Sequence, residues 1–133
     1  MPEELTNTEL AERAYAAWNA DDLEAMVSFC HPDAEFIPSG VFPGMEPGYR
    51  GQEGVRRWWH TFHEPWREIK VIPERIAERP GGMDVLVRFE GIGRDGIETT
   101  MSFINAIEVR DGLLYRLLGR AADEETLREL GLD

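Results

Sequence analysis

A predicted hairpin in the C-terminal third constrains the fold of this chain more than any other stretch. Residues 97–110 form a long apolar-rich run, Asp111-Gly112 follows, and residues 113–120 form a second run. An Asp-Gly pair between two such runs is a strong hairpin signal, because both turn residues must tolerate a positive φ angle. The sequence therefore predicts an antiparallel strand pair at the centre of a sheet.

One face of the first hairpin strand is apolar except at a single position. Successive side chains of a strand point to opposite faces, so one face is shared by Met101, Phe103, Asn105, Ile107 and Val109. Asn105 is the polar member of this set. If the sheet has a concave side, we expect Asn105 to point into the space that the fold encloses.

The elements before the hairpin follow a recognisable order. Apolar residues at helical spacing predict a helix after a capping box at residues 6–9, a second helix over residues 23–30 and a third over residues 52–63. Strands are predicted at residues 34–38, 68–78 and 83–90, and a short helix begins at Asp123. Helices followed by a meander of strands are typical of an α+β fold with helices packed on one face of an antiparallel sheet.

Composition excludes several classes of function. The chain has 133 residues, which predicts a single domain over residues 1–133, and a formal net charge of -12, which disfavours binding to nucleic acid or anionic membranes. The lone Cys30 offers no intramolecular disulfide, and residues 1–10 lack the apolar core of a secretion signal. No apolar run has the length of a membrane span. We therefore expect a soluble, cytoplasmic protein.

Three stretches together resemble the SnoaL-like proteins of the nuclear-transport-factor-2-like superfamily, which includes ketosteroid isomerases and polyketide cyclases. They are residues 15–23, residues 48–59 (GYRGQEGVRRWW) and residues 91–132, with Val109-Arg110-Asp111-Gly112 inside the last. The resemblance implies a cone-shaped roll, in which a curved antiparallel or mixed sheet wraps around three N-terminal helices and a short C-terminal helix follows. It also implies an apolar pocket in the cone and a homodimer formed through the sheet face.

The resemblance carries over to few catalytic positions. The general-base aspartate of the ketosteroid isomerases would match Ile37-Pro38, and neither residue can accept a proton. Their oxyanion-hole tyrosine would match Ala14, and we expect Tyr15, one residue later, to be rotated away by about 100°. Their central-strand acid would match Asn105, which can still donate a hydrogen bond. The acid–base residues of the cyclases and of limonene-type epoxide hydrolases have no clear equivalent.

Asn105 is consequently the best candidate for a catalytic or ligand-binding residue, as a hydrogen-bond donor to a ligand oxygen. Its alternative role is that of a buried amide satisfied within the protein. The aromatic residues of the core are candidate ligand contacts or simple core residues. Tyr49, Phe42 and Met45 are expected at the rim of the pocket. The predicted ligand-binding set is Trp18, Phe36, Tyr49, Trp59, Phe62, Phe103 and Asn105.

No cofactor or metal is predicted. His60 and His63 lie three residues apart on the third helix, but no third ligand stands at a usable spacing, and zinc requires at least three. The sequence has no glycine-rich phosphate loop. Glu35, Glu46 and Glu90 are the carboxylates whose burial would matter, because a catalytic carboxylate needs a raised pKa.

Three functions remain open from the sequence. The first is binding of a small apolar, oxygen-bearing molecule, and the second is a cofactor-independent isomerase, cyclase or hydratase acting on such a molecule. The third is a non-catalytic dimerisation or interaction module, which would have a filled cone without a cavity. Outward-facing residues compatible with a dimer are Leu86, Ile104, Ala106 and Leu118, so Ile104→Asp is expected to dissociate a dimer without unfolding the subunit.

Overall fold

The computed structural model of the chain describes residues 5–39 and 44–133 and contains one six-stranded sheet. Its elements are α1 (Asn7–Asn19), α2 (Leu23–Ser28), β1 (Cys30–Ile37), β2 (Tyr49–Arg50), α3 (Gly51–His63), β3 (Trp66–Arg79), β4 (Gly82–Gly93), β5 (Glu98–Arg110), β6 (Leu113–Ala121) and α4 (Glu124–Leu130). The strand order is β2-β1-β6-β5-β4-β3, with β1 and β6 parallel and the other neighbours antiparallel.

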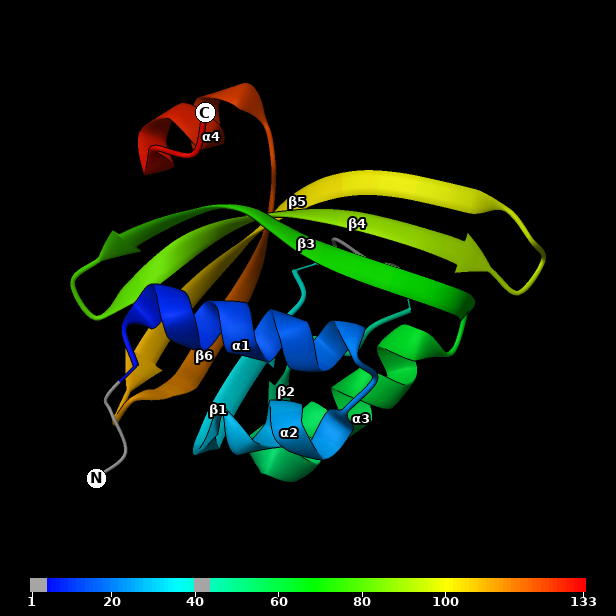
Figure 1. Cartoon of the computed structure of the whole chain (residues 1–133), viewed down its shortest axis with the longest axis horizontal. Helices are drawn as coiled ribbons and strands as arrows, with labels where there is room; N and C mark the ends of the chain where they lie inside the picture. The colour runs from blue at the N-terminus through cyan, green and yellow to red at the C-terminus, as the bar shows by residue number, and fades with distance from the viewer. Residues whose placement is uncertain (1–4, 40–43) are drawn as a thin grey trace.

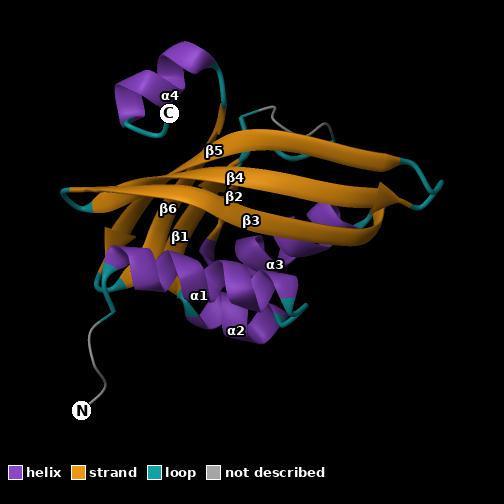
Figure 2. Ribbon diagram, turned by 45° about the horizontal axis from the view of Figure 1, so that its top comes forward, coloured by secondary structure: helices purple, strands orange, loops and turns teal. Residues whose placement is uncertain are grey.

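The sheet is strongly curved and separates three helices on one side from a single helix on the other. Helices α1, α2 and α3 lie on its concave side, and the short α4 lies on the opposite side (Figures 1 and 2). The sheet is open, because β2 and β3 stand at its two edges. This arrangement confirms the α+β class and the cone-shaped roll expected from the sequence.

The predicted hairpin lies at the centre of the sheet. Asp111 and Gly112 both have positive φ angles, 55° and 73°, as a tight two-residue turn requires. Strand β5 pairs with β6 on one side and with β4 on the other. It begins at Glu98, one residue later than predicted, and Ile97 lies exposed just before the strand.

The boundary between α2 and β1 differs from the prediction. Helix α2 ends at Ser28, and Cys30 already belongs to β1, where it pairs with Leu114 of the parallel strand β6. A register shift between Cys30 and Glu35 accommodates Pro32, which has no N–H to donate to a strand ladder. Pairing with a distant strand therefore overrides the helical spacing that extended the predicted helix to Cys30.

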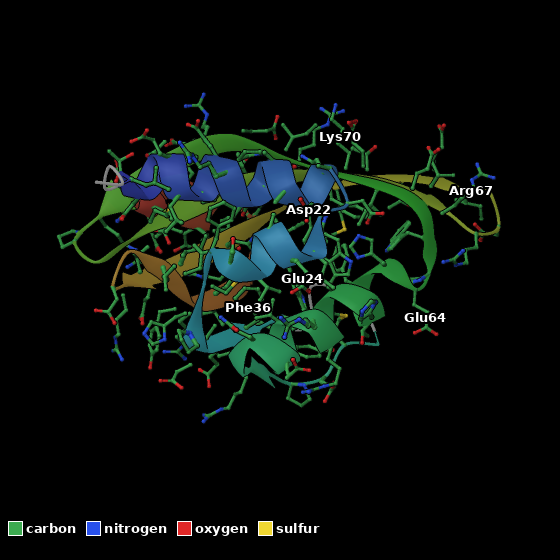
Figure 3. The ribbon with its side chains drawn as sticks, turned by 60° about the horizontal axis from the view of Figure 1, so that its bottom comes forward. Asp22, Glu24, Phe36, Glu64, Arg67 and Lys70 are labelled. Atoms are coloured by element: carbon green, nitrogen blue, oxygen red, sulfur yellow. The ribbon has the colours of Figure 1, made fainter. Side chains whose placement is uncertain are left out.

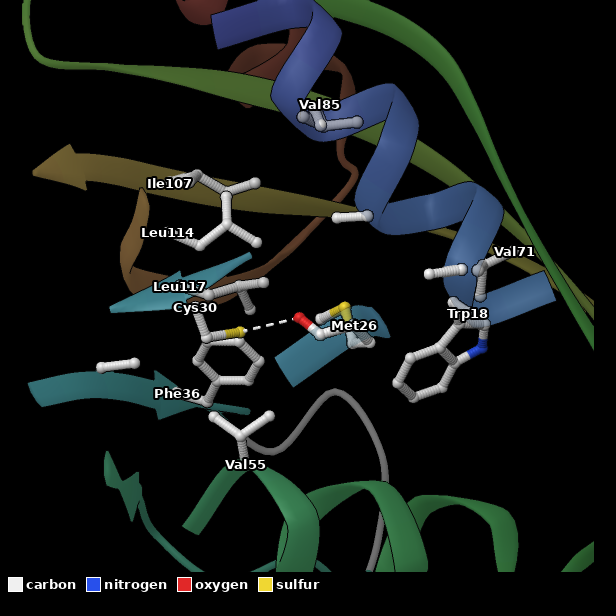
Figure 4. Packing of buried hydrophobic residues seen from close by; sticks show 14 of the residues in the cluster. Trp18, Met26, Cys30, Phe36, Val55, Val71, Val85, Ile107, Leu114 and Leu117 are labelled. Carbon is white, nitrogen blue, oxygen red and sulfur yellow. Dashed lines mark hydrogen bonds between the residues drawn. The ribbon is translucent and has the colours of Figure 1, made fainter. Parts of the chain in front are cut away.

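Aromatic and aliphatic side chains fill the space between the helices and the sheet (Figure 4). The ring of Trp18 on α1 lies 4.6 Å from that of Trp59 and 5.2 Å from that of Phe62, both on α3. Cys30 is a buried core residue whose Sγ donates to the Met26 carbonyl oxygen at 3.5 Å, and burial raises the pKa of its thiol to about 12. These contacts join the helical layer to the sheet.

The side chain of Asn19 ties the end of α1 to the edge strand β3. Its Nδ2 donates to the Val71 carbonyl oxygen at 2.7 Å, and its Oδ1 accepts from the Val71 N–H at 2.8 Å. The amide thus replaces the missing neighbouring strand at this point of the edge. We expect Asn19→Ala to lower the free energy of unfolding by about 2 kcal/mol, the sum of two ordinary hydrogen bonds.

Urea unfolding followed by circular dichroism measures this effect. Asn7→Ala is the matched control, because the Asn7 side chain donates one bond, to Gly82 O at 3.2 Å, and we expect about half the loss. Asn19→Asp should lose at least as much as Asn19→Ala, since a carboxylate oxygen would face the Val71 carbonyl. An Asn19→Asp variant as stable as the wild type would contradict this role.

The outer face of the sheet carries a second, smaller buried contact. Ile104 on β5 is fully buried and Leu132, just after α4, is 1% exposed, although neither belongs to the main core cluster. Helix α4 lies on this side of the sheet (Figure 2), and Leu132 belongs to the segment that follows it. The expectation that Ile104 is an exposed dimer contact is therefore wrong.

None of the helices in residues 5–39 and 44–133 is long and apolar enough to cross a membrane.

Candidate functional site

A cavity of about 60 Å³ lies between α1, α3 and the concave face of β5 and β6. This space stays open because two elements carry small residues here, namely Ala11 and Ala14 on α1 and Gly119 on β6. The remaining wall is mostly aromatic and aliphatic. By contrast, the charged residues labelled in Figure 3 (Asp22, Glu24, Glu64, Arg67 and Lys70) are exposed on the outside, whereas Phe36 is buried.

Tyr15 and Asn105 form a polar pair in the wall of this cavity. Asn105 on β5 is 7% exposed, and its Nδ2 donates a hydrogen bond to the Tyr15 hydroxyl oxygen at 2.8 Å. The Tyr15 oxygen acts as the acceptor in this bond, so its own proton is left for another acceptor. Burial raises the pKa of Tyr15 well above its ordinary value, against the smaller opposing effect of the bond from Asn105, and the phenol stays protonated.

The expectation that Tyr15 is rotated away from the pocket is wrong. The cavity lining includes Ala11, Ala14, Tyr15 and Trp18, which stand at i, i+3, i+4 and i+7 along α1. Such a stripe covers more than about 100° of a helix surface, so Ala14 and Tyr15 both face the sheet. The long phenol side chain then reaches β5.

The predicted ligand-binding residues fall into two groups. Trp18, Phe62, Phe103 and Asn105 line the cavity. Phe36, Tyr49 and Trp59 are buried but lie outside the cavity lining.

Tyr49 is not a rim residue, contrary to the expectation from the sequence. It pairs with Phe36 in the short β2–β1 ladder and is fully buried, with its hydroxyl accepting from Glu46 N at 3.0 Å. Pairing at the sheet edge turns this loop tyrosine inward. Met45 does line the cavity, and Phe42 lies outside the described residues.

Trp58 is a cavity residue that sequence reasoning left unassigned. Its ring packs edge-on against Phe36 at 4.8 Å and tilts against Trp18 at the same distance. The signal available in the sequence was its position next to Trp59, on the border of the apolar stripe of α3.

Three candidate carboxylates are placed away from the cavity. Glu35 pairs with Arg50 at 2.9 Å and with Arg116 at 3.4 Å. Glu46 pairs with Arg57 at 3.2 Å and Glu90 with Arg88 at 3.8 Å. Among the described residues that line the cavity, Tyr15 is the sole one with a titratable side chain.

The surroundings of the two histidines of α3 do not form a metal site. His63 Nδ1 lies 2.7 Å from the Trp59 carbonyl oxygen, and its ring stacks on the Trp59 indole at 4.5 Å. Burial lowers the pKa of His63, with the Trp59 bond opposing the shift. His60 is exposed, and the described residues hold no group of three or more His, Cys, Asp or Glu side chains able to bind a metal ion.

The indole nitrogen of Trp18 is a buried polar atom in the aromatic cluster of the core. Trp18 is 5% exposed, and its Nε1 is buried without a hydrogen-bond partner among the described residues. The indole is instead surrounded by rings, including Trp58, Trp59, Phe62 and His63. An unsatisfied buried donor costs about 1–3 kcal/mol, so it requires an explanation.

Comparison with protein families gives a match to the SnoaL-like domain over residues 11–117. The heme chaperone HemW of Mycobacterium tuberculosis (strain H37Rv) is 27% identical over 122 residues, which cover 91% of this chain and 29% of that protein. The chain thus spans less than a third of the length of this curated relative.

Solved structures share the fold. TerC co-crystallized with polyporic acid has a TM-score of 0.79 and 24% identity, covering 93% of this chain and 96% of that one. RV0760c from Mycobacterium tuberculosis, in complex with estradiol-17beta-hemisuccinate, has a TM-score of 0.72 and 17% identity, with 85% and 91% covered. The Δ5-3-ketosteroid isomerase from Mycobacterium sp. has a TM-score of 0.70 and 19% identity, with 85% and 90% covered.

Proposed function

This chain belongs to the SnoaL-like domain family, and on that premise we propose that it binds a small, uncharged, largely apolar molecule in the cavity between α1, α3 and the sheet. The Tyr15 hydroxyl would donate a hydrogen bond to an oxygen atom of this molecule. The observation that carries the proposal is the Tyr15–Asn105 pair, a polar group with a free proton in an otherwise apolar wall.

The pair is suited to hold an oxygen atom in a fixed position. The bond from Asn105 occupies the Tyr15 oxygen, and it therefore restrains the direction of the hydroxyl proton. Preorganised donors of this kind bind an acceptor without paying for reorientation. Two structural neighbours, TerC and RV0760c, were solved with organic molecules, which supports a ligand-binding use of the same fold here.

The composition of the lining favours binding over turnover. An isomerase, cyclase or hydratase must move a proton with a base within hydrogen-bond reach of its substrate. Tyr15 is the sole titratable group in the described lining, and its raised pKa makes it a donor and not a base at neutral pH. A non-catalytic interaction module is also disfavoured, because that function was expected to have a filled cone, and this fold holds a cavity.

Tyr15→Phe tests the proposal directly. We expect its affinity for a neutral ketone such as acetophenone to fall about fivefold, the equivalent of one hydrogen bond of about 1 kcal/mol. The measurement is a titration of ¹⁵N-labelled protein followed by NMR. Tyr115→Phe is the matched control, because Tyr115 packs with His31 and Arg110 outside the cavity and its loss should leave affinity unchanged.

The outcomes separate the parts of the proposal. Equal affinities of Tyr15→Phe and the wild type would remove the role assigned to the hydroxyl. Failure of acetophenone and smaller ketones to bind the wild type at millimolar concentration would remove the binding function itself. Proton exchange of the ketone α-hydrogens with solvent, catalysed by the wild type but not by Tyr15→Phe, would replace binding by turnover.

A further inference from the structure

Building on the proposed function, we infer that the bound molecule carries a hydroxyl group, whose oxygen accepts a hydrogen bond from the Tyr15 hydroxyl and whose proton is donated to Asn105 Oδ1. The ligand class is thereby narrowed from apolar molecules with any oxygen atom to uncharged alcohols and phenols. The proton of the hydroxyl group distinguishes these compounds from ketones and ethers of the same shape.

The inference starts from the side-chain oxygen of Asn105. The amide donates through Nδ2 to the Tyr15 hydroxyl oxygen at 2.8 Å, and no described residue donates a hydrogen bond to its Oδ1. Buried side-chain oxygens of this kind usually accept at least one hydrogen bond, and an amide oxygen has two lone pairs for this purpose. Asn105 Oδ1 is therefore an acceptor that the described part of the chain leaves unused.

Asn105 Oδ1 is accessible from the cavity. Among the described residues, Trp18 Nε1 is the sole fully enclosed side-chain polar atom without a partner, so the unpaired Oδ1 of Asn105 is not fully enclosed. Asn105 lines the cavity, as do Phe103 and Ile107, its neighbours on the same face of β5. The small part of the Asn105 side chain that remains exposed therefore faces the cavity.

One ligand oxygen can reach both Tyr15 and Asn105 Oδ1. In an amide, one carbon joins the nitrogen and the oxygen through bonds of about 1.33 and 1.23 Å. Since the Tyr15 oxygen lies 2.8 Å from Asn105 Nδ2, it is at most about 5.4 Å from Asn105 Oδ1. Two hydrogen bonds of about 2.8 Å that meet at one oxygen span up to about 5.6 Å, which covers this separation.

A hydroxyl group matches this donor and this acceptor better than other polar groups do. A ketone or ether oxygen accepts from Tyr15 but has no proton for Asn105 Oδ1, which would stay unpaired beside the ligand. A carboxylic acid ionises at neutral pH, and an amine is protonated. The described lining includes no lysine, arginine or histidine to pair with the anion and no carboxylate to pair with the cation, so either ion would lose its hydration without compensation.

The test compares ligands that differ in this proton. The protein is titrated with butan-2-ol and butanone, with cyclohexanol and cyclohexanone, and with 1-phenylethanol and acetophenone. Asn105→Leu removes the acceptor while Tyr15 can still donate to both members of a pair. The ratio of the ketone to the alcohol dissociation constant should therefore be about fivefold smaller in Asn105→Leu than in the wild type. Ile107→Val is the matched control, because it changes the same wall but leaves the polar pair in place, and it should keep the wild-type ratio.

The carbon signal of the Asn105 side chain provides an independent readout in the unmodified protein. The chain has three asparagines, Asn7, Asn19 and Asn105, so labelling with ¹³C at Cγ gives three signals, which Asn7→Ala and Asn19→Ala assign even if Asn105→Leu does not fold. A carbonyl carbon signal moves downfield when its oxygen accepts a hydrogen bond. We expect the Asn105 signal to move further downfield with a bound alcohol than with the corresponding ketone, and the other two signals to stay in place, since Asn7 and Asn19 lie outside the cavity lining.

The possible failures are distinguishable. If the ketones bind and Tyr15→Phe weakens them, but Asn105→Leu keeps the wild-type ratio, the bond to Asn105 Oδ1 is refuted while the proposed function stands. Equal shifts of the Asn105 signal with an alcohol and its ketone refute it as well. If none of the six compounds binds at millimolar concentration, the proposed function fails and this inference fails with it. A ratio that falls equally in Asn105→Leu and Ile107→Val would also refute the inference, since it would reflect loosened packing.

Discussion

Replacing Ile104 by aspartate is expected to unfold the protein or to lower its free energy of unfolding by more than about 4 kcal/mol. Ile104 is fully buried on the outer face of β5, opposite Leu86 on β4 and Arg120 on β6. A carboxylate at this fully buried position would lose its hydration. Since small domains are stable by only about 5–15 kcal/mol, this loss is a large fraction of the total.

Ser102→Asp is the matched control for this prediction. Ser102 lies two residues along the same strand, on the same face, and is exposed opposite Arg88, so its replacement should change stability by less than about 0.5 kcal/mol. Urea unfolding measures both variants, and sedimentation velocity measures their assembly. A folded Ile104→Asp of wild-type stability that is monomeric where the wild type is dimeric would restore Ile104 as a dimer contact.

Whether Ile104 contacts the C-terminal segment can be tested separately. If Leu132 covers Ile104, the losses from Ile104→Ala and Leu132→Ala should not add in the double variant, because the second truncation removes a contact that is already lost. Additive losses would place the two residues in different contacts.

The fold was predictable wherever local signals determine it. The Asp111-Gly112 turn specifies the central hairpin through its two positive φ angles, and the alternation of β5 places Phe103, Asn105 and Ile107 on the buried face. The start of β1 was not predictable in this way. Cys30 enters a strand because β6, more than 80 residues later, offers a parallel partner in Leu114, and helical spacing contains no information about that pairing.

The site was predictable to a smaller extent. The inward direction of Asn105 followed from the alternation of its strand alone. Its partner Tyr15 was expected to point away from the pocket, because the resemblance to the ketosteroid isomerases places the tyrosine one residue earlier, at Ala14. An offset of one residue does not remove a long side chain from a broad helical face. The unpaired Trp18 nitrogen could not be predicted at all, because a missing partner is a property of the whole surroundings of a residue and not of its neighbours in sequence.

Asn105→Asp is expected to make stability fall steeply as the pH rises. The variant places a carboxyl of nearly the same shape in the apolar wall, where burial raises the pKa of an aspartate by about 3 units or more above its unfolded value near 3.9. The folded state then binds more protons than the unfolded state between these two pKa values. Stability therefore falls by about 1.4 kcal/mol per pH unit in that range, a loss of about 4 kcal/mol at pH 7 that is absent below pH 4.

Asn105→Leu is the matched control, because it also removes the bond to Tyr15 but has no group that titrates. Its difference from the wild type should be the same at pH 4 and pH 7, whereas the difference for Asn105→Asp should grow with pH. Parallel pH profiles for Asn105→Asp and the wild type would mean that the carboxylate is hydrated and the cavity is wet, which would remove the basis for an apolar ligand. The same variant should also lose ketone affinity as the pH rises, because an ionised carboxylate accepts the Tyr15 proton that the ligand oxygen needs.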